Sequence, residues 1–146
     1  MKKGLSILTI SLMLSLLALP ASAGSINAVL SGKSYHFDSS HDWNENNTGL
    51  GIEYEFAQKS AWKKIAMANG FRDSANGMSY MAGAGLHRRL YETDKLDGFY
   101  IYAGINAFVM TREDVNGGNP FPGVLPSISI GTSKIGVNLT YLPRKA

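Results

Sequence analysis

The sequence contains no cysteine, which excludes disulfide bonds, thiolate catalysis and zinc sites built on cysteine. Downstream of residue 23 it has no run of 18 apolar residues, so that part offers no transmembrane helix. The sequence also lacks a large excess of charge of either sign. The formal net charge is +3 over 146 residues, which gives no electrostatic argument for binding nucleic acid. The three histidines are scattered along the chain, so we expect neither a metal site nor another cofactor.

The first 23 residues have the pattern of a signal peptide. A basic start, Met1-Lys2-Lys3, precedes an apolar segment of about 15 residues, shorter than the roughly 20 that a membrane-anchoring helix needs. Ala21-Ser22-Ala23 then supplies the small residues at a cleavage site. We therefore predict export, cleavage before Gly24, and one domain over residues 24–146. Removal of the two lysines lowers the net charge from +3 to +1.

Alternation with a period of two runs through the rest of the chain. In residues 49–56, Leu50, Ile52, Tyr54 and Phe56 alternate with glycine and glutamate, as expected of a strand with one apolar face. Four further segments show the same rhythm, at 78–87, 99–109, 126–131 and 135–141. It is less regular at 62–71 and least regular at 25–37. The second face is mostly Gly, Ala, Ser, Asn and Thr, too small and polar for a soluble core. The pattern predicts an all-β, up-and-down antiparallel outer-membrane β-barrel, with a soluble periplasmic sandwich or lipocalin-like barrel as the alternative.

Up-and-down topology decides which residues can meet. It places His36, the pair Asp73-Ser74 and residues 111–114 on one outer rim. Histidine, serine and a carboxylate together support acyl transfer, because imidazole accepts a proton from a hydroxyl that the other groups position or activate. Asp-Ser at a turn also has a plain structural explanation, since both side chains bond nearby backbone. Of the other histidines, we expect His41 in a solvated loop and His87 in the lumen or at the opposite rim.

Several ordered segments resemble one known family. They are Phe71-Arg72-Asp73-Ser74-Ala75-Asn76, Ala82-Gly83-Ala84-Gly85, Pro122-Gly123-Val124-Leu125-Pro126, Leu139-Thr140-Tyr141-Leu142-Pro143, and Trp43-Asn44-Glu45 leading into Gly49-Leu50-Gly51. Over roughly residues 35–143 the chain is similar to the lipid A palmitoyltransferase (PagP) family. The resemblance implies an eight-stranded outer-membrane barrel that moves a palmitoyl chain from a phospholipid donor to lipid A. We expect a monomer that uses His36, Asp73 and Ser74 for catalysis.

The resemblance also implies how the lipid is held. The acyl chain is expected inside the barrel along Met81, Gly83 and Gly85, with Gly85 at the cavity floor. Pro126 and Pro143 match a pair of strand prolines that open a lateral gate, a role with a physical basis because proline has no N–H for the ladder.

The chain departs from the family in three ways. It has no proline in residues 24–61 for a second gate, no amphipathic helix before the barrel, and only seven evident strands where an even number is normal. A non-enzymatic barrel, structural or binding, is therefore the alternative function. Lipid A deacylation ranks last, because the His-x-Ser pattern of that chemistry does not occur.

Overall fold

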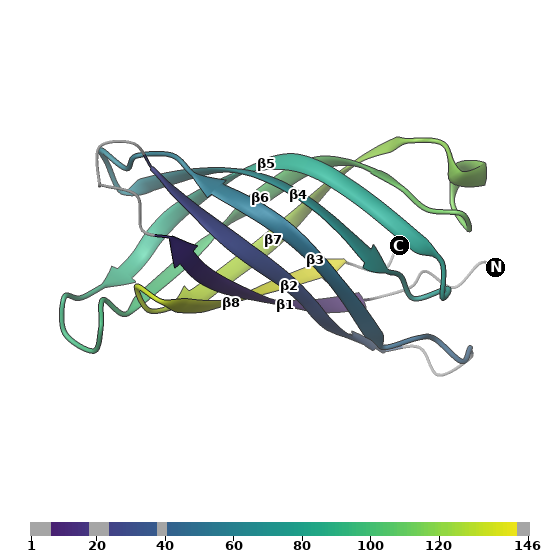
Figure 1. The fold of residues 1–146 in the computed structure, drawn as a ribbon, viewed down its shortest axis with the longest axis horizontal. Coiled ribbons are helices and arrows are strands. Elements are labelled where there is room, and N and C mark those ends of the chain that lie inside the picture. Colours follow the sequence, from purple (N-terminus) through teal and green to yellow (C-terminus); the bar gives the residue numbers. More distant parts are fainter. Residues whose placement is uncertain (1–6, 18–23, 38–40, 143–146) are drawn as a thin grey trace.

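The chain forms a single closed β-barrel. The structure, a computed structural model, describes residues 7–17, 24–37 and 41–142 (Figure 1). A short 3-10 helix, η1 (Asn116–Gly118), lies in the connection between the sixth and seventh strands. The strands are β1 (Ile7–Leu17), β2 (Ser25–His36), β3 (Asn46–Glu55), β4 (Trp62–Arg72), β5 (Met78–Glu92), β6 (Tyr100–Thr111), β7 (Phe121–Gly131) and β8 (Ile135–Leu142).

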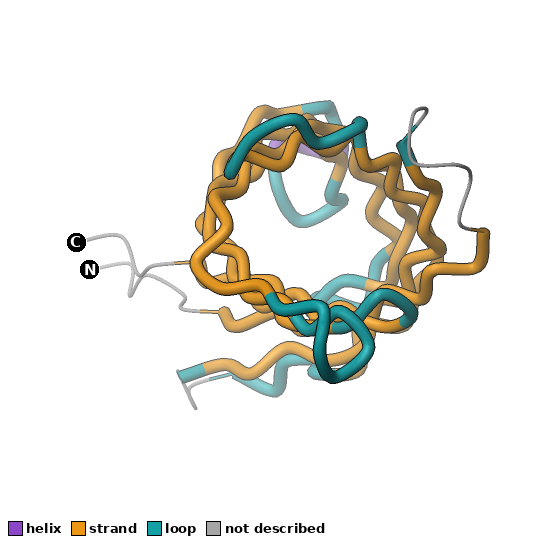
Figure 2. Tube along the Cα trace, turned by 90° about the vertical axis from the view of Figure 1, so that its left-hand side faces the viewer, coloured by secondary structure: helices purple, strands orange, loops and turns teal. Residues whose placement is uncertain are grey.

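Each strand pairs antiparallel with its neighbour in the sequence, and β1 pairs with β8 to close the ring (Figure 2). The fold is therefore one ring of strands and not two packed sheets, which removes the sandwich alternative. None of the described residues belongs to a helix long and apolar enough to cross a membrane.

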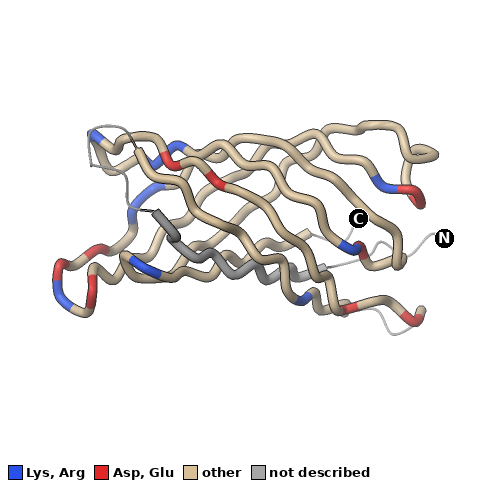
Figure 3. The backbone as a smooth tube through the Cα atoms, viewed as in Figure 1, with Lys and Arg blue, Asp and Glu red and all other residues tan. Residues whose placement is uncertain are grey.

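The barrel is inside out compared with a soluble protein. Among the described side chains only three hydrophobic residues are buried, Val29, Ile65 and Tyr102, whereas thirteen polar or charged residues are. Large apolar side chains cover the outside instead, for example Leu50 at 66% and Val124 at 63% exposure. Lysine, arginine and acidic residues gather at the two ends of the barrel (Figure 3). Such a wall is typical of barrels whose outer surface faces lipid.

The predicted all-β barrel is confirmed, and the seven predicted strands correspond to β2–β8. Two boundaries differ by five residues. β5 continues to Glu92, and β7 begins at Phe121 and not at Pro126. Pro122 does not prevent this extension, because it is an exposed residue at the start of the strand, where a missing N–H is tolerated.

The eighth strand comes from an unexpected place. β1 lies within the apolar core of the predicted signal peptide, and its pairing with β2 and β8 satisfies two strand edges. The predicted cleavage site, 21–23, lies outside the described residues. The division into signal peptide and barrel domain stays a prediction.

The weakest seam of the barrel lies between β7 and β8. Their ladder pairs five positions, from Ser127 with Thr140 to Gly131 with Gly136, whereas β6 and β7 pair eleven. Pro126 stands immediately beyond the last pair. Within the described residues, the half of β7 from Phe121 to Pro126 is thus paired on its β6 side only. The second predicted gate residue, Pro143, lies outside the described residues.

Candidate active site

Asp73 organises the tight turn between β4 and β5. The Asp73 carboxylate is buried (2% exposed) and accepts three hydrogen bonds: Oδ1 from the N–H groups of Ala75 (2.9 Å) and Gly77 (3.0 Å), and Oδ2 from the Ser79 hydroxyl (2.7 Å). Asn76 adopts a positive φ of 67°, a conformation that asparagine tolerates. These hydrogen bonds tie the Asp73 carboxylate to the backbone of its own turn and to Ser79. They thereby fix the conformation of the turn that carries Ser74.

Ser74 is the residue that this turn positions. It is 5% exposed and lines an internal cavity together with Asp73. Its carbonyl oxygen accepts a hydrogen bond from the Asn44 N–H (2.9 Å), and Asn44 Nδ2 donates to the Asp73 carbonyl (3.0 Å). Asn47 Nδ2 donates to the Arg72 carbonyl (2.9 Å). Two bonds from Asn44 thus fasten the β2–β3 connection to the Asp73 turn, and the third joins the start of β3 to the end of β4.

His36 ends β2 at the same rim. It is 8% exposed and its ring stacks on Trp43, with centroids 5.4 Å apart and planes 12° from parallel. Its backbone N–H donates to Glu45 Oε1 (3.1 Å), which also lies 3.6 Å from His36 Nδ1. Neither ring nitrogen has a hydrogen-bond partner among the described residues, although both are buried. Buried polar atoms without a partner are uncommon, and an ordered water, an ion or a bound ligand can satisfy them.

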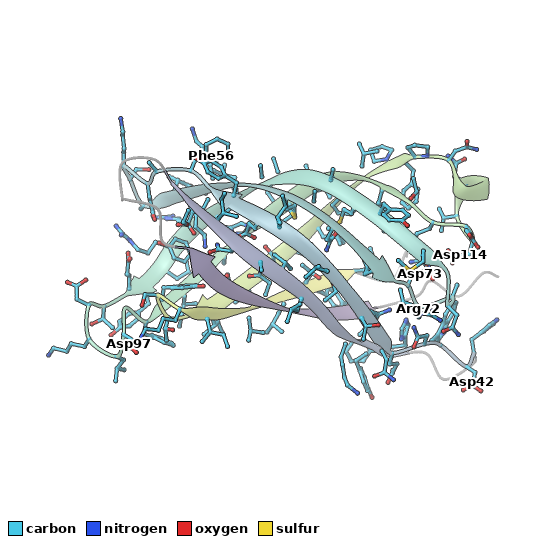
Figure 4. All side chains as sticks on the ribbon, in the orientation of Figure 1. Asp42, Phe56, Arg72, Asp73, Asp97 and Asp114 are labelled. Carbon is cyan, nitrogen blue, oxygen red and sulfur yellow. The ribbon has the colours of Figure 1, made fainter. Side chains whose placement is uncertain are left out.

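A cavity of about 160 Å³ opens behind Ser74 into the half of the barrel nearest this rim. Its polar lining includes Ser34, Asn47, Asn69 and Arg112. The apolar lining comes from Val29, Ile52, Met67, Phe71, Met81, Phe108, Met110, Leu125 and Leu142. Figure 4 shows Arg72 and Asp73 at the same end of the barrel as Asp42 and Asp114, while Phe56 and Asp97 mark the opposite end. We call the end that carries Asp73 the Asp73 rim.

The three predicted cavity residues lie on the inner face of β5, but only Met81 lines the cavity. A Cβ atom at Gly85 would lie 2.3 Å from Asn106 Oδ1 and 2.7 Å from Ile65 Cγ1, so these side chains fill the space in front of it. A Cβ at Gly83 would meet the Ala107 carbonyl at 2.3 Å.

A polar network of Asn106, His87 and Ser127 lies in the lumen on the side of the cavity away from the Asp73 rim. Asn106, a lining residue, lies 2.8 Å from His87 Nε2, and the Ser127 hydroxyl is 3.1 Å from the same nitrogen. His87 is only 2% exposed, which agrees with its predicted place in the lumen. On the adjacent strand, buried Lys63 pairs with His87 in the β4–β5 ladder, lies 3.7 Å from Glu55 and stacks over the Tyr102 ring at 4.5 Å.

The structure thus brings Asp73 and Ser74 together at a cavity mouth and places His36 at the same rim. No hydrogen bond joins His36 to either of them among the described residues; the His36 partner is Glu45. Sequence reasoning missed Glu45 and Ser79. Trp43-Asn44-Glu45 was noticed only as a resemblance, and the Asp73–Ser79 spacing carries no motif.

These features define a small antiparallel β-barrel with a polar lumen and a serine-aspartate turn at the mouth of an internal cavity. Residues 25–146 match the family described as "Antimicrobial peptide resistance and lipid A acylation protein PagP", so the chain belongs to that family of lipid A acylation proteins. Among curated proteins the chain has no match.

Proposed function

We propose that this protein is an acyltransferase of the Gram-negative outer membrane that moves a palmitoyl or similar long acyl chain from a phospholipid to lipid A. One observation carries the proposal: Ser74 and the Asp73 turn stand at the mouth of a cavity whose apolar lining is rich in methionine, phenylalanine and leucine. A hydroxyl beside an apolar pocket inside a barrel suits an ester whose acyl chain enters the pocket. Family membership supports lipid A as the acceptor.

The wall of the barrel supports a membrane location. Exposed Leu50, Ile105 and Val124 point away from a lumen that contains buried serine, asparagine, glutamate and lysine. In hydrocarbon this arrangement buries apolar area against lipid and leaves every ladder hydrogen bond inside the protein. We propose that the Asp73 rim faces outward, where lipid A is found, and that the barrel acts as a monomer.

The reaction requires proton transfer and ester exchange. The hydroxyl oxygen of lipid A bonds to the acyl carbonyl carbon, the bond from that carbon to the glycerol oxygen breaks, and the proton ends on the glycerol oxygen. His36 is the proposed base, since neither ring nitrogen has a hydrogen-bond partner among the described residues and Glu45 lies 3.6 Å from Nδ1, where it can stabilise the imidazolium. Ser74 contacts the ester at the cavity mouth, and Asp73 acts by fixing the turn.

The donor is proposed to enter through the seam between β7 and β8. Beyond Pro126 the two strands have no paired positions among the described residues, so separating them there breaks no ladder bond. Seam entry places the acyl chain beside Leu125, which lines the cavity.

Mass spectrometry of lipid A from an expressing Gram-negative host tests the proposal. Ser74→Ala should abolish the added palmitate, whereas Ser133→Ala, an exposed turn serine distant in sequence, should not. His36→Asn should also abolish it. The matched control is His41→Asn, because His41 stacks on the same Trp43 ring at 5.3 Å but is exposed. Unchanged palmitate in Ser74→Ala would refute the mechanism.

A non-enzymatic barrel remains the second candidate, because Glu45 and not Asp73 or Ser74 is the neighbour of His36. That candidate requires no added palmitate in cells that express the wild-type protein, with the barrel folded in the membrane.

A further inference from the structure

A second hollow lies on the outside of the barrel, next to the Asp73 rim. It is an open groove of about 510 Å³ over β4, β5 and β6. The outward residues of the floor are small, Ala68, Gly70 and Ala82, and larger side chains flank them. Of these, Tyr80 is 61% and Leu50 66% exposed. We call this hollow the outer groove.

The outer groove is directly opposite the internal cavity. Asn69, Met81 and Met110 contribute to the lining of both, so the wall between them is one strand layer thick. The groove reaches the rim, since Thr111 is the last residue of β6 and Tyr80 follows the Asp73 turn by three residues. A molecule lying in it would therefore have one end beside the turn that carries Ser74.

A cation stands at the upper end of the groove. Arg72 shares the outer face of β4 with Ala68 and Gly70, because alternate residues of a strand point the same way. It lies two residues beyond Gly70, about 7 Å along the strand. Arg72 is exposed and makes no ion pair within the part of the chain that the structure describes. An apolar groove ending at a free guanidinium is complementary to a lipid with an anionic headgroup.

We propose that the outer groove binds one acyl chain of the acceptor, a phosphorylated glycolipid, with an anionic group of its headgroup against Arg72. This inference rests on the proposed function for the identity of the acceptor. The groove would then set where the acceptor hydroxyl meets the cavity mouth, while the donor chain occupies the lumen. Filling the groove should weaken acceptor binding and leave the donor side of the reaction unchanged.

Ala82→Leu fills the groove from outside, and Ala107→Leu is its matched control. Both alanines are exposed on the outer face of adjacent strands, but Ala107 does not line the groove. With purified protein in phospholipid vesicles and lipid A as acceptor, Ala82→Leu should raise the KM for lipid A roughly tenfold, as expected for losing about two buried methylene contacts. The kcat and the hydrolysis of phospholipid by water should stay at the wild-type values.

Arg72→Gln should raise the same KM, and the difference from wild type should shrink as salt is added. Equal KM values for Ala82→Leu and Ala107→Leu would overturn the proposal. A fall in phospholipid hydrolysis with Ala82→Leu alone would also overturn it, since the groove would then serve the donor.

A binding measurement separates this inference from the proposed function. Titration of lipid A into the refolded barrel should shift the amide resonances of Gly70 and Ala82, and leave that of Ala107 in place, even in Ser74→Ala. Failure of acyl transfer with these shifts present would refute the proposed function alone. Absence of the shifts would refute the groove, whether or not transfer occurs.

Discussion

The hydrogen bond from Ser79 to Asp73 gives the sharpest stability prediction. Ser79 is fully buried, and its hydroxyl is 2.7 Å from Asp73 Oδ2. No other donor reaches that oxygen among the described residues, because the Ala75 and Gly77 N–H groups both bond to Oδ1. Ser79→Ala removes one oxygen atom from the side chain and leaves half of a buried carboxylate without a partner.

A hydrogen bond to a charged group contributes about 1.5–3 kcal/mol, so we expect Ser79→Ala to lower the free energy of unfolding by about 2 kcal/mol. That difference changes the ratio of folded to unfolded protein by roughly thirtyfold. It is large for a single oxygen atom because both groups are buried, at 0% and 2% exposure.

Urea unfolding of the barrel in phospholipid vesicles provides the assay, with tryptophan fluorescence as the signal. Trp43 lies in the connection that is bonded to the Asp73 turn, so it reports on this site. Ser34→Ala is the control. Ser34 is 4% exposed, and its Oγ has no hydrogen-bond partner within the described segments. Equal stability losses for Ser79→Ala and Ser34→Ala would refute the reasoning.

Three further predictions concern the lumen and the N-terminus. Gly85→Ala should destabilise the barrel by about 1–3 kcal/mol, and adding Asn106→Ala should restore part of the loss in urea unfolding, because the new Cβ meets Asn106 Oδ1 at 2.3 Å. No recovery would contradict that packing. Lys63→Met should lower the free energy of unfolding by about 1–3 kcal/mol in the same assay, since it leaves Glu55 without the cation that lies 3.7 Å away; an unaltered urea midpoint would count against it. The mass of the exported protein should correspond to a chain that begins at Gly24, and a retained Met1 would contradict the predicted signal peptide.

The fold could be predicted because alternation survives on both faces of most strands. In β5 the outer residues from Tyr80 to Leu86 are all apolar or aromatic, and the inner ones from Ser79 to His87 are glycine, serine or histidine apart from Met81, so the period of two is visible without knowing the partner strands. β1 could not be predicted, since a nearly continuous apolar segment after two lysines has the pattern of a leader. A chain cleaved before Gly24 lacks β1, so its barrel would have to close by pairing the edges of β2 and β8 directly, because each unpaired backbone group in hydrocarbon costs several kcal/mol.

The site was only half predictable. Topology alone places His36, Asp73 and Ser74 on one rim, and all three are found there. Topology does not determine which side chains hydrogen-bond to these residues. The Asp73 carboxylate bonds within its own turn, while the neighbour of His36 is Glu45, brought back by a loop whose path the sequence does not reveal. The space in front of Gly85 is likewise decided by Asn106 and Ile65 on neighbouring strands.

The central claim is that this barrel transfers an acyl chain, and reconstitution tests it most directly. Purified protein is folded into vesicles that contain phospholipid with a labelled palmitoyl chain together with lipid A, and the labelled lipids are separated. We expect the labelled palmitoyl chain in lipid A with the wild-type protein and none there with Ser74→Ala. Label that stays in the phospholipid, with the wild-type barrel folded, would contradict it.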